Sequence, residues 1–448
     1  RKVDLRVYVE PHNMHKTAFA MESLIKAFEW DEKRFNLSYD LDIYMIVAVD
    51  DFNMGAMENK GLNIFNSDCV LADPATSSDA TFERIEGIVA HEYFHNWSGN
   101  RVTCRDWFQL SLKEGFTVFR DSQFSADMNS PGVKRVEDVS FLRTHQFAED
   151  AGPMAHPVRP DSFIEISNFY TLTVYEKGAE VVRMLHTLLG HELFIAGAKN
   201  YFESHDGKAV TCDDFVSAME QVSGRDLLQF RRWYEQSGTP DLIIEDHYDP
   251  VTRLATLTVR QSNGLSADGS KKPPLHLPLA VGLVVNGELH TFEEGSTTRL
   301  LEVTEPSQVF QIDNVEDKPV VSLLRGFSAP VRLKSADDDD TLAMLIGSDT
   351  DDFVKWDAMQ RYASRVIEAQ MRGESLSGAF VSAYRQVMSS DIDDAMKALL
   401  LMLPSEESLA DRQAQQGCVD VFEIRAAREH IKKTLAAEFS EQWTAWYS

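Results

Sequence analysis

The feature that most constrains this chain is a pair of histidines four positions apart in a stretch with helical periodicity. His91 and His95 enclose Glu92 and two further residues. Because an α-helix advances about 100° per residue, the two imidazoles lie one turn apart on one face. They can hold a Zn²⁺ ion at about 2.0–2.1 Å, with Glu92 beside them as general base for a water at the metal. The apolar spacing over Phe82–Trp97 therefore predicts a buried, metal-binding helix.

A candidate for the third metal ligand follows at a spacing that suits a second helix. Eighteen residues separate Glu114 from His95, which lets one helix end and another, expected over Leu112–Phe124, pack beside it. Catalytic zinc sites use three protein ligands and leave the fourth position open. Asp121 lies two turns beyond Glu114 and could accept a hydrogen bond from a zinc histidine. A solvated helix carboxylate is the equal alternative for Asp121.

The pattern of apolar residues changes twice along the chain. Residues 1–240 mix short β-like runs with helical periodicity, residues 241–335 alternate as strands do, and residues 336–448 return to helical spacing. At roughly 150 residues per domain, the length predicts about three domains. We expect a multidomain α+β protein, with a mostly helical catalytic domain carrying a small β-sheet, then a β-sandwich, then an α-helical domain.

The middle region contains a strong hairpin signal. Leu277–Val285 and Glu288–Phe292 flank Asn286-Gly287, the dipeptide most typical of a two-residue turn. Further on, Asp337–Asp340 precedes an apolar run. These carboxylates favour a helix N-terminus over a calcium site, because the glycine and terminal glutamate of the EF-hand loop are missing.

The charge of the chain excludes several classes of function. With 44 Lys and Arg against 71 Asp and Glu, the formal net charge is −27. A nucleic-acid binder must neutralise phosphates with basic side chains, and an anionic membrane surface would repel this chain. Solubility is the simplest reason for the surplus, and attraction of cationic substrates is a second.

Two motifs together resemble a known family. Gly55-Ala-Met-Glu-Asn59, followed by the H-E-x-x-H segment and Glu114, is similar to the M1 family of gluzincin zinc metallopeptidases. The string Phe169–Gly178 resembles the same family. The resemblance is strong over residues 40–240 and implies a thermolysin-like catalytic domain over 1–240, with part of its sheet upstream. It further implies a β-sandwich over 241–335 and the start of a superhelical domain over 336–448.

The resemblance also implies a substrate-binding segment. Glu58 matches the residue that anchors the free α-ammonium of a peptide, and Gly55 and Ala56 match main-chain hydrogen-bonding positions. Met54 and Met57 would line an adaptable pocket for the first side chain, and Asn59 belongs to the same motif. Without the metal motif, a tight turn with core methionines would be the better interpretation.

Two tyrosines are assigned by resemblance alone. Tyr175 matches the catalytic tyrosine whose hydroxyl stabilises the oxyanion. Tyr170 matches a tyrosine near the same pocket, with a core aromatic as its equal alternative. The family's second anchor for the substrate amine comes from an upstream domain, so the resemblance places it outside this sequence.

The sequence therefore predicts a zinc-dependent aminopeptidase that removes neutral or basic N-terminal residues, with one Zn²⁺ per chain. The alternatives are a gluzincin-type epoxide hydrolase and a non-catalytic binding protein that retains the fold. We expect peptide substrates with a free amine, no nucleic acid, no membrane span in this chain, and a monomer. Four cysteines without C-x-x-C spacing fit a reducing, cytoplasmic setting in a bacterium. We also expect the chain to be part of a longer peptidase, because it opens inside a strand-like run.

Overall fold

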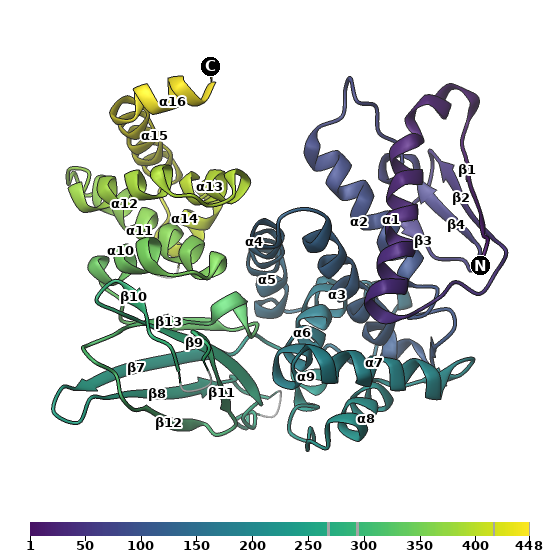
Figure 1. Cartoon of the computed structure of the whole chain (residues 1–448), viewed down its shortest axis with the longest axis horizontal. Coiled ribbons are helices and arrows are strands. Elements are labelled where there is room, and N and C mark those ends of the chain that lie inside the picture. The colour runs from purple at the N-terminus through teal and green to yellow at the C-terminus, as the bar shows by residue number, and fades with distance from the viewer. Residues whose placement is uncertain (267–268, 293–294, 415–416, 448) are drawn as a thin grey trace.

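The computed structural model describes residues 1–266, 269–292, 295–414 and 417–447. Figure 1 shows three regions: a mixed region of helices and a small sheet, a β region, and a helical region that ends at the C-terminus. This order confirms the predicted fold class.

The first region opens with a four-stranded sheet. Its strand order is β1-β2-β4-β3, with β1, β2 and β4 parallel and β3 antiparallel at one edge. The strands are β1 (Asp4–Tyr8), β2 (Ile43–Val49), β3 (Ala56–Met57) and β4 (Leu62–Asn66). The edge strand β3 thus comes from the segment that was predicted to bind substrate.

Two neighbouring helices carry the predicted metal ligands. Helix α2 (Asp79–Phe94) begins at Ser78, whose side chain accepts a hydrogen bond from the Thr81 amide. It ends three residues before the predicted limit, so that His95 is its C-cap. Helix α3 (Leu110–Met128) packs against α2, as the spacing predicts.

The remaining elements of this region surround α2 and α3. The helices are α1 (Ala18–Phe35), α4 (Pro131–Phe141), α5 (Phe147–Ala151), α6 (Gly178–Leu189), α7 (His191–His205), α8 (Cys212–Ser223) and α9 (Arg232–Glu235). A two-stranded ladder pairs β5 (Thr103–Cys104) with β6 (Ala209–Val210). Two π-helical turns, Leu142–Gln146 and Thr173–Lys177, precede α5 and α6.

The β region consists of two four-stranded sheets. One has the order β12-β8-β7-β14, and the other joins β10, β11 and β13 to β9. The strands are β7 (Asp241–Asp249), β8 (Leu254–Ser262), β9 (Leu277–Val285), β10 (Glu288–Leu289), β11 (Arg299–Val303), β12 (Ser307–Ile312), β13 (Val320–Leu323) and β14 (Arg332–Ser335). Asn286 and Gly287, both with positive φ, form the predicted two-residue turn between β9 and β10.

The last region is helical. Asp338 caps α10 by accepting a hydrogen bond from the Thr341 amide, so the acidic run marks a helix N-terminus. The helices are α10 (Asp339–Ser348), α11 (Asp352–Met371), α12 (Gly378–Ser389), α13 (Asp394–Leu401), α14 (Glu406–Ala414), α15 (Val421–Glu438) and α16 (Ser440–Tyr447). No helix in the described part of the chain is long and apolar enough to cross a membrane.

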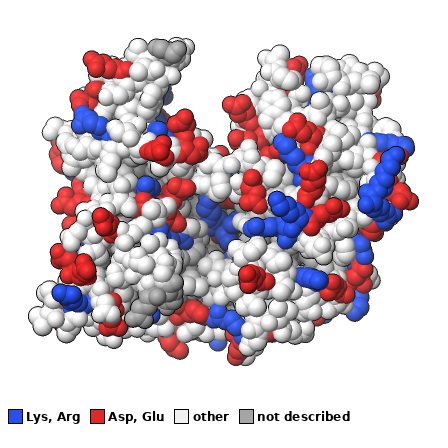
Figure 2. All heavy atoms as spheres, in the orientation of Figure 1, with Lys and Arg blue, Asp and Glu red and all other residues white. Residues whose placement is uncertain are grey.

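Two partly buried arginines connect the first region to the other two. Arg135 on α4 pairs with Glu180 at 2.7 Å and also donates to the carbonyl oxygens of Gly326 and Phe327 in the β region. Arg143 reaches Asp357 on α11 at 2.6 Å. Figure 2 shows acidic and basic side chains interspersed over one face of the molecule, without an extended basic patch on that face.

Candidate metal centre

Three side chains from α2 and α3 bring their ligand atoms together. Nε2 of His95 lies 3.0 Å from Nε2 of His91 and 3.1 Å from Oε2 of Glu114. Within the described residues, this is the one group of three or more His, Cys, Asp or Glu side chains whose ligand atoms converge in this way. Glu114 and His95 are almost fully buried, at 2% and 1% exposure.

The outer nitrogen of each imidazole faces an acceptor. Nδ1 of His91 lies 2.6 Å from the Asp121 carboxylate, and Nδ1 of His95 lies 2.7 Å from the carbonyl oxygen of Ser98. Nδ1 therefore carries the proton in both rings, and the Nε2 lone pairs point at each other and at Glu114. Two lone pairs and a carboxylate at this distance need a cation between them. The donor set of two imidazoles and one carboxylate suits Zn²⁺.

A proton can take the place of that cation. Although desolvation lowers it, the hydrogen bonds to Asp121 and Glu114 raise the pKa of His91 well above its usual value. Binding of a metal therefore requires His91 to release a proton, and metal affinity will weaken as the pH falls.

Glu92 lies beside this cluster with an unpaired oxygen. It is 6% exposed, and its Oε2 has no hydrogen-bond partner among the described residues. Burial raises the pKa of Glu92 to about 7. A carboxylate with such a pKa can both accept and return a proton near neutral pH.

Glu58 is joined to the metal cluster by a lysine that the sequence analysis missed. Nζ of Lys113 donates to Glu58 at 2.7 Å and to Glu114 at 2.5 Å. Burial opposes the shift, but His95 and Lys113 lower the pKa of Glu58, which is therefore an anion. Only the adjacency of Lys113 to Glu114 in the sequence could have drawn attention to it.

The predicted substrate segment borders the cluster as an exposed edge. Met54 and Met57 are 49% and 38% exposed, and Ala56 lies on β3, which pairs with β4 at the edge of the sheet. A Cβ at Gly55 would make only an ordinary contact, 3.7 Å from Sγ of Cys69. The chain itself thus does not demand glycine there. The backbone of Asn59 accepts a hydrogen bond from the Leu62 amide as the segment turns into β4.

The two predicted tyrosines lie in the segment that leads into α6. Tyr175 stands in the π-helical turn Thr173–Lys177, a feature found often at functional sites. Burial and a hydrogen bond to Glu114 raise the pKa of Tyr175, so its hydroxyl is protonated and can donate. Tyr170, 38% exposed, has its ring 6.3 Å from that of Tyr175. It is therefore not a buried core aromatic.

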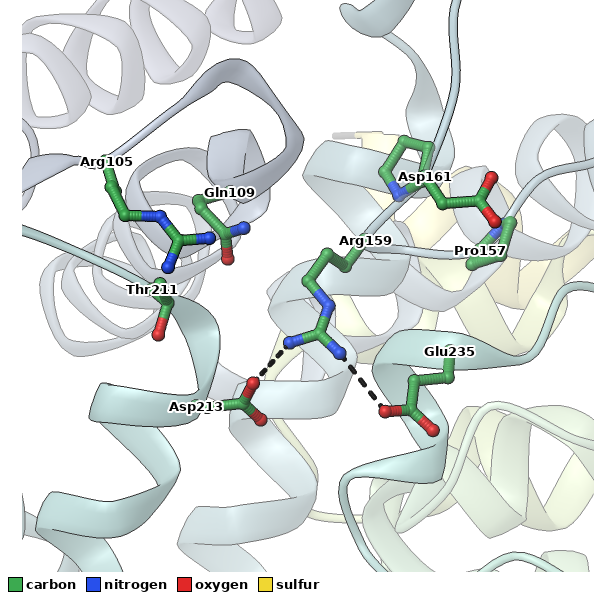
Figure 3. A pocket seen from close by; sticks show the side chains of 9 residues that line it. Arg105, Gln109, Pro157, Arg159, Asp161, Thr211, Asp213 and Glu235 are labelled. Carbon is green, nitrogen blue, oxygen red and sulfur yellow. Dashed lines mark hydrogen bonds and ion pairs between the residues drawn. The ribbon is translucent and has the colours of Figure 1, made fainter.

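A separate cavity of about 430 Å³ lies beside the N-terminus of α8, and no residue of the metal cluster lines it. Figure 3 shows Arg159 reaching across it to Asp213 and Glu235, at 2.6 and 3.1 Å. Gln109 in its wall donates to Asp106 and accepts from the Cys212 amide. Arg159, Asp213 and Glu235 thus pair with one another across the cavity.

Comparison with known proteins places the parts of the chain in families. Residues 19–234 match the peptidase family M1 domain. Residues 238–336 match a domain of unknown function with an Ig-like fold, and residues 339–448 match one with ARM repeats.

Individual relatives extend over the whole chain. Aminopeptidase N of Escherichia coli is 50% identical over 100% of this chain and 52% of its own length, and that of Haemophilus influenzae is 49% identical over the same shares. A crystal structure of Legionella pneumophila aminopeptidase A in complex with aspartic acid is 32% identical. It has a TM-score of 0.88 and covers 99% of this chain and 50% of that one. The chain thus spans about half the length of the relatives it matches.

Proposed function

Since this chain belongs to peptidase family M1, we propose that it is a zinc aminopeptidase that removes single residues from the free N-termini of peptides. Members of the family are zinc enzymes in general. The observation that carries the proposal is the convergence of His91, His95 and Glu114 beside a buried Glu92 whose Oε2 lacks a partner in the described structure.

The proposed mechanism assigns one task to each neighbouring side chain. Zinc, when bound, polarises the scissile carbonyl and makes water a better nucleophile at neutral pH. Glu92 takes a proton from the attacking water and returns it to the nitrogen of the leaving amine. The Tyr175 hydroxyl donates a hydrogen bond to the oxygen on which negative charge develops.

The anionic Glu58 explains why a free N-terminus would be preferred. Its carboxylate can hold the α-ammonium of a peptide that lies along β3, while Met54 and Met57 receive the first side chain. Lys113 occupies the position next to Glu58 in this structure, so a substrate ammonium would share or displace that contact. We propose a preference for neutral or basic first residues, because the surrounding carboxylates would repel an acidic one.

The alternatives are less well supported. The relatives named above are aminopeptidases, which disfavours an epoxide hydrolase. The intact ligands His91, His95 and Glu114, together with Glu92 and Tyr175, argue against a non-catalytic binding protein. The monomeric state and a cytoplasmic location remain predictions, and the four free cysteines fit the latter.

Hydrolysis of alanyl, arginyl and glutamyl reporter amides tests this proposal. We expect cleavage of the first two, loss of activity with a chelator, and recovery on addition of Zn²⁺. Cleavage of a leukotriene epoxide without amide hydrolysis would favour the epoxide hydrolase, and zinc binding without any turnover would favour a binding protein.

A further inference from the structure

The turn that follows α2 lies unusually close to the imidazole of His95. The carbonyl oxygen of Ser98 accepts the hydrogen bond from Nδ1 of His95 at 2.7 Å. Gly99 follows with φ of +139°, and a Cβ there would stand only 2.9 Å from the same Nδ1. Any other residue would therefore press on the ring. The orientation of His95 depends on this turn.

Two hydroxyl groups connect the turn to α3. Oγ of Ser98 lies 2.7 Å from Oγ1 of Thr117, which in turn donates to the Ser98 carbonyl oxygen at 3.3 Å. Either hydroxyl can donate to the other, because Oγ of Ser98 also has the carbonyl oxygen of Phe94 as an acceptor at 3.2 Å. Both hydroxyls are fully buried, so each bond is made in a site without water. The Ser98 carbonyl oxygen, which accepts the hydrogen bond from His95, therefore also accepts one from Thr117.

A buried arginine completes the attachment. Arg120 donates from Nη1 to the carbonyl oxygen of Phe94 at 2.9 Å and to Oγ of Ser98 at 3.0 Å. It is fully buried, and Nη2 pairs with Asp31 on α1. The guanidinium carbon also lies 4.8 Å from the centre of the Phe94 ring. Arg120 thus fixes both ends of the turn, where α2 runs out of its own hydrogen bonds.

We propose that Ser98, Thr117 and Arg120, here called the His95 clamp, are positioning residues that fix the tautomer and orientation of His95 and thereby strengthen zinc binding. The inference rests on the zinc site of the proposed function and deepens it. Helix α3 then contributes to all three ligands. It carries Glu114 itself, the clamp residues Thr117 and Arg120, and Asp121, which accepts a hydrogen bond from His91.

Zinc affinity of the metal-free chain, measured by competition with a fluorescent chelator, tests the clamp. Removal of an outer partner of a zinc histidine typically weakens metal binding by roughly 10–100-fold. We expect Thr117→Val and Ser98→Ala to show a loss in that range. Thr117→Ser keeps the hydroxyl and should restore affinity. Ser125→Ala, which deletes a hydroxyl from the same helix without touching His95, should match the wild type.

Thermal unfolding of the metal-free variants separates positioning from folding. If Thr117→Val fails to fold, Ser98→Ala carries the test, because it removes only one oxygen. Wild-type affinity in a folded Thr117→Val or Ser98→Ala variant would overturn the clamp, and so would an equal loss in Thr117→Ser or Ser125→Ala. Failure of the wild-type chain to bind Zn²⁺ would instead overturn the zinc site itself, and the clamp with it.

Discussion

Two groups of charged side chains in this molecule differ in whether their members have partners. Beside α8, Arg159 lies between Asp213 and Glu235 within ion-pair distance of both (Figure 3). At the metal cluster, Glu58 and Glu114 share the ammonium group of Lys113, while Oε2 of Glu92 has no partner among the described residues.

The difference shows what marks a functional site here. The cavity beside α8 offers volume, but Arg159, Asp213 and Glu235 in its wall already pair with one another. The cluster retains a carboxylate oxygen that is unpaired within the described part of the chain. It also has two facing imidazole nitrogens, which only a cation or a proton can stabilise.

The largest effect should come from Glu92. Replacement by glutamine keeps the shape but removes the base, so turnover should fall by roughly 10²–10⁴-fold. Zinc content, measured by atomic absorption, should stay at the wild-type level because Glu92 is not a ligand. Undiminished hydrolysis by Glu92→Gln would contradict the assigned mechanism.

A smaller loss is expected at Glu58. A hydrogen bond to a charged group is worth about 1.5–3 kcal/mol, so Glu58→Gln should lower kcat/KM for peptides with a free amine by roughly 10–100-fold. The loss should appear mainly in KM. An unchanged preference for free over N-acetylated termini would remove Glu58 as the anchor.

His186 on α6 provides a test at a half-buried group outside both regions. Burial and Arg183 lower the pKa of His186 to about 4, so the folded state resists its protonation. Stability due to the neutral ring is present above about pH 6.5 and is lost as the pH falls toward 4. Between about pH 7.5 and 5.5 we expect a loss of about 1 kcal/mol that His186→Gln lacks. Urea unfolding of both proteins at the two pH values measures it, and parallel pH dependence would refute it.

The smallest effect is expected at Arg159. Arg159→Met removes the central cation of the cavity in Figure 3 without reaching the metal cluster. Peptide hydrolysis and zinc affinity should stay within about twofold of the wild type, as for most changes away from a site. A tenfold fall in hydrolysis by a folded variant would mean that this cavity contributes to peptide hydrolysis.

The part of the site that follows from local spacing could be predicted. The four-residue interval of His91 and His95 places both on one helix face, and the Asn286-Gly287 turn appears where its dipeptide predicts. The predicted end of this helix, Trp97, lies three residues beyond the observed end of α2. The helix ends at Phe94 because the chain then enters the turn that contains Gly99.

Contacts between distant segments could not be predicted in this way. Lys113 reaches Glu58 across 55 positions, and Arg120 reaches Asp31 across 89. The spacing of apolar residues does not reveal such partners, because they depend on how three helices and a sheet edge pack. The position of Tyr175 in a π-helical turn likewise has no signal in spacing, and its role came from resemblance alone.

Zinc titration of the metal-free chain, followed by calorimetry at neutral pH, tests the central claim most directly. We expect one tight zinc site per chain, with release of protons on binding. Glu114→Gln should lose this site while the cavity lined by Arg159, Asp213 and Glu235 stays intact. No zinc binding by the wild-type chain, or undiminished binding by Glu114→Gln, would contradict it.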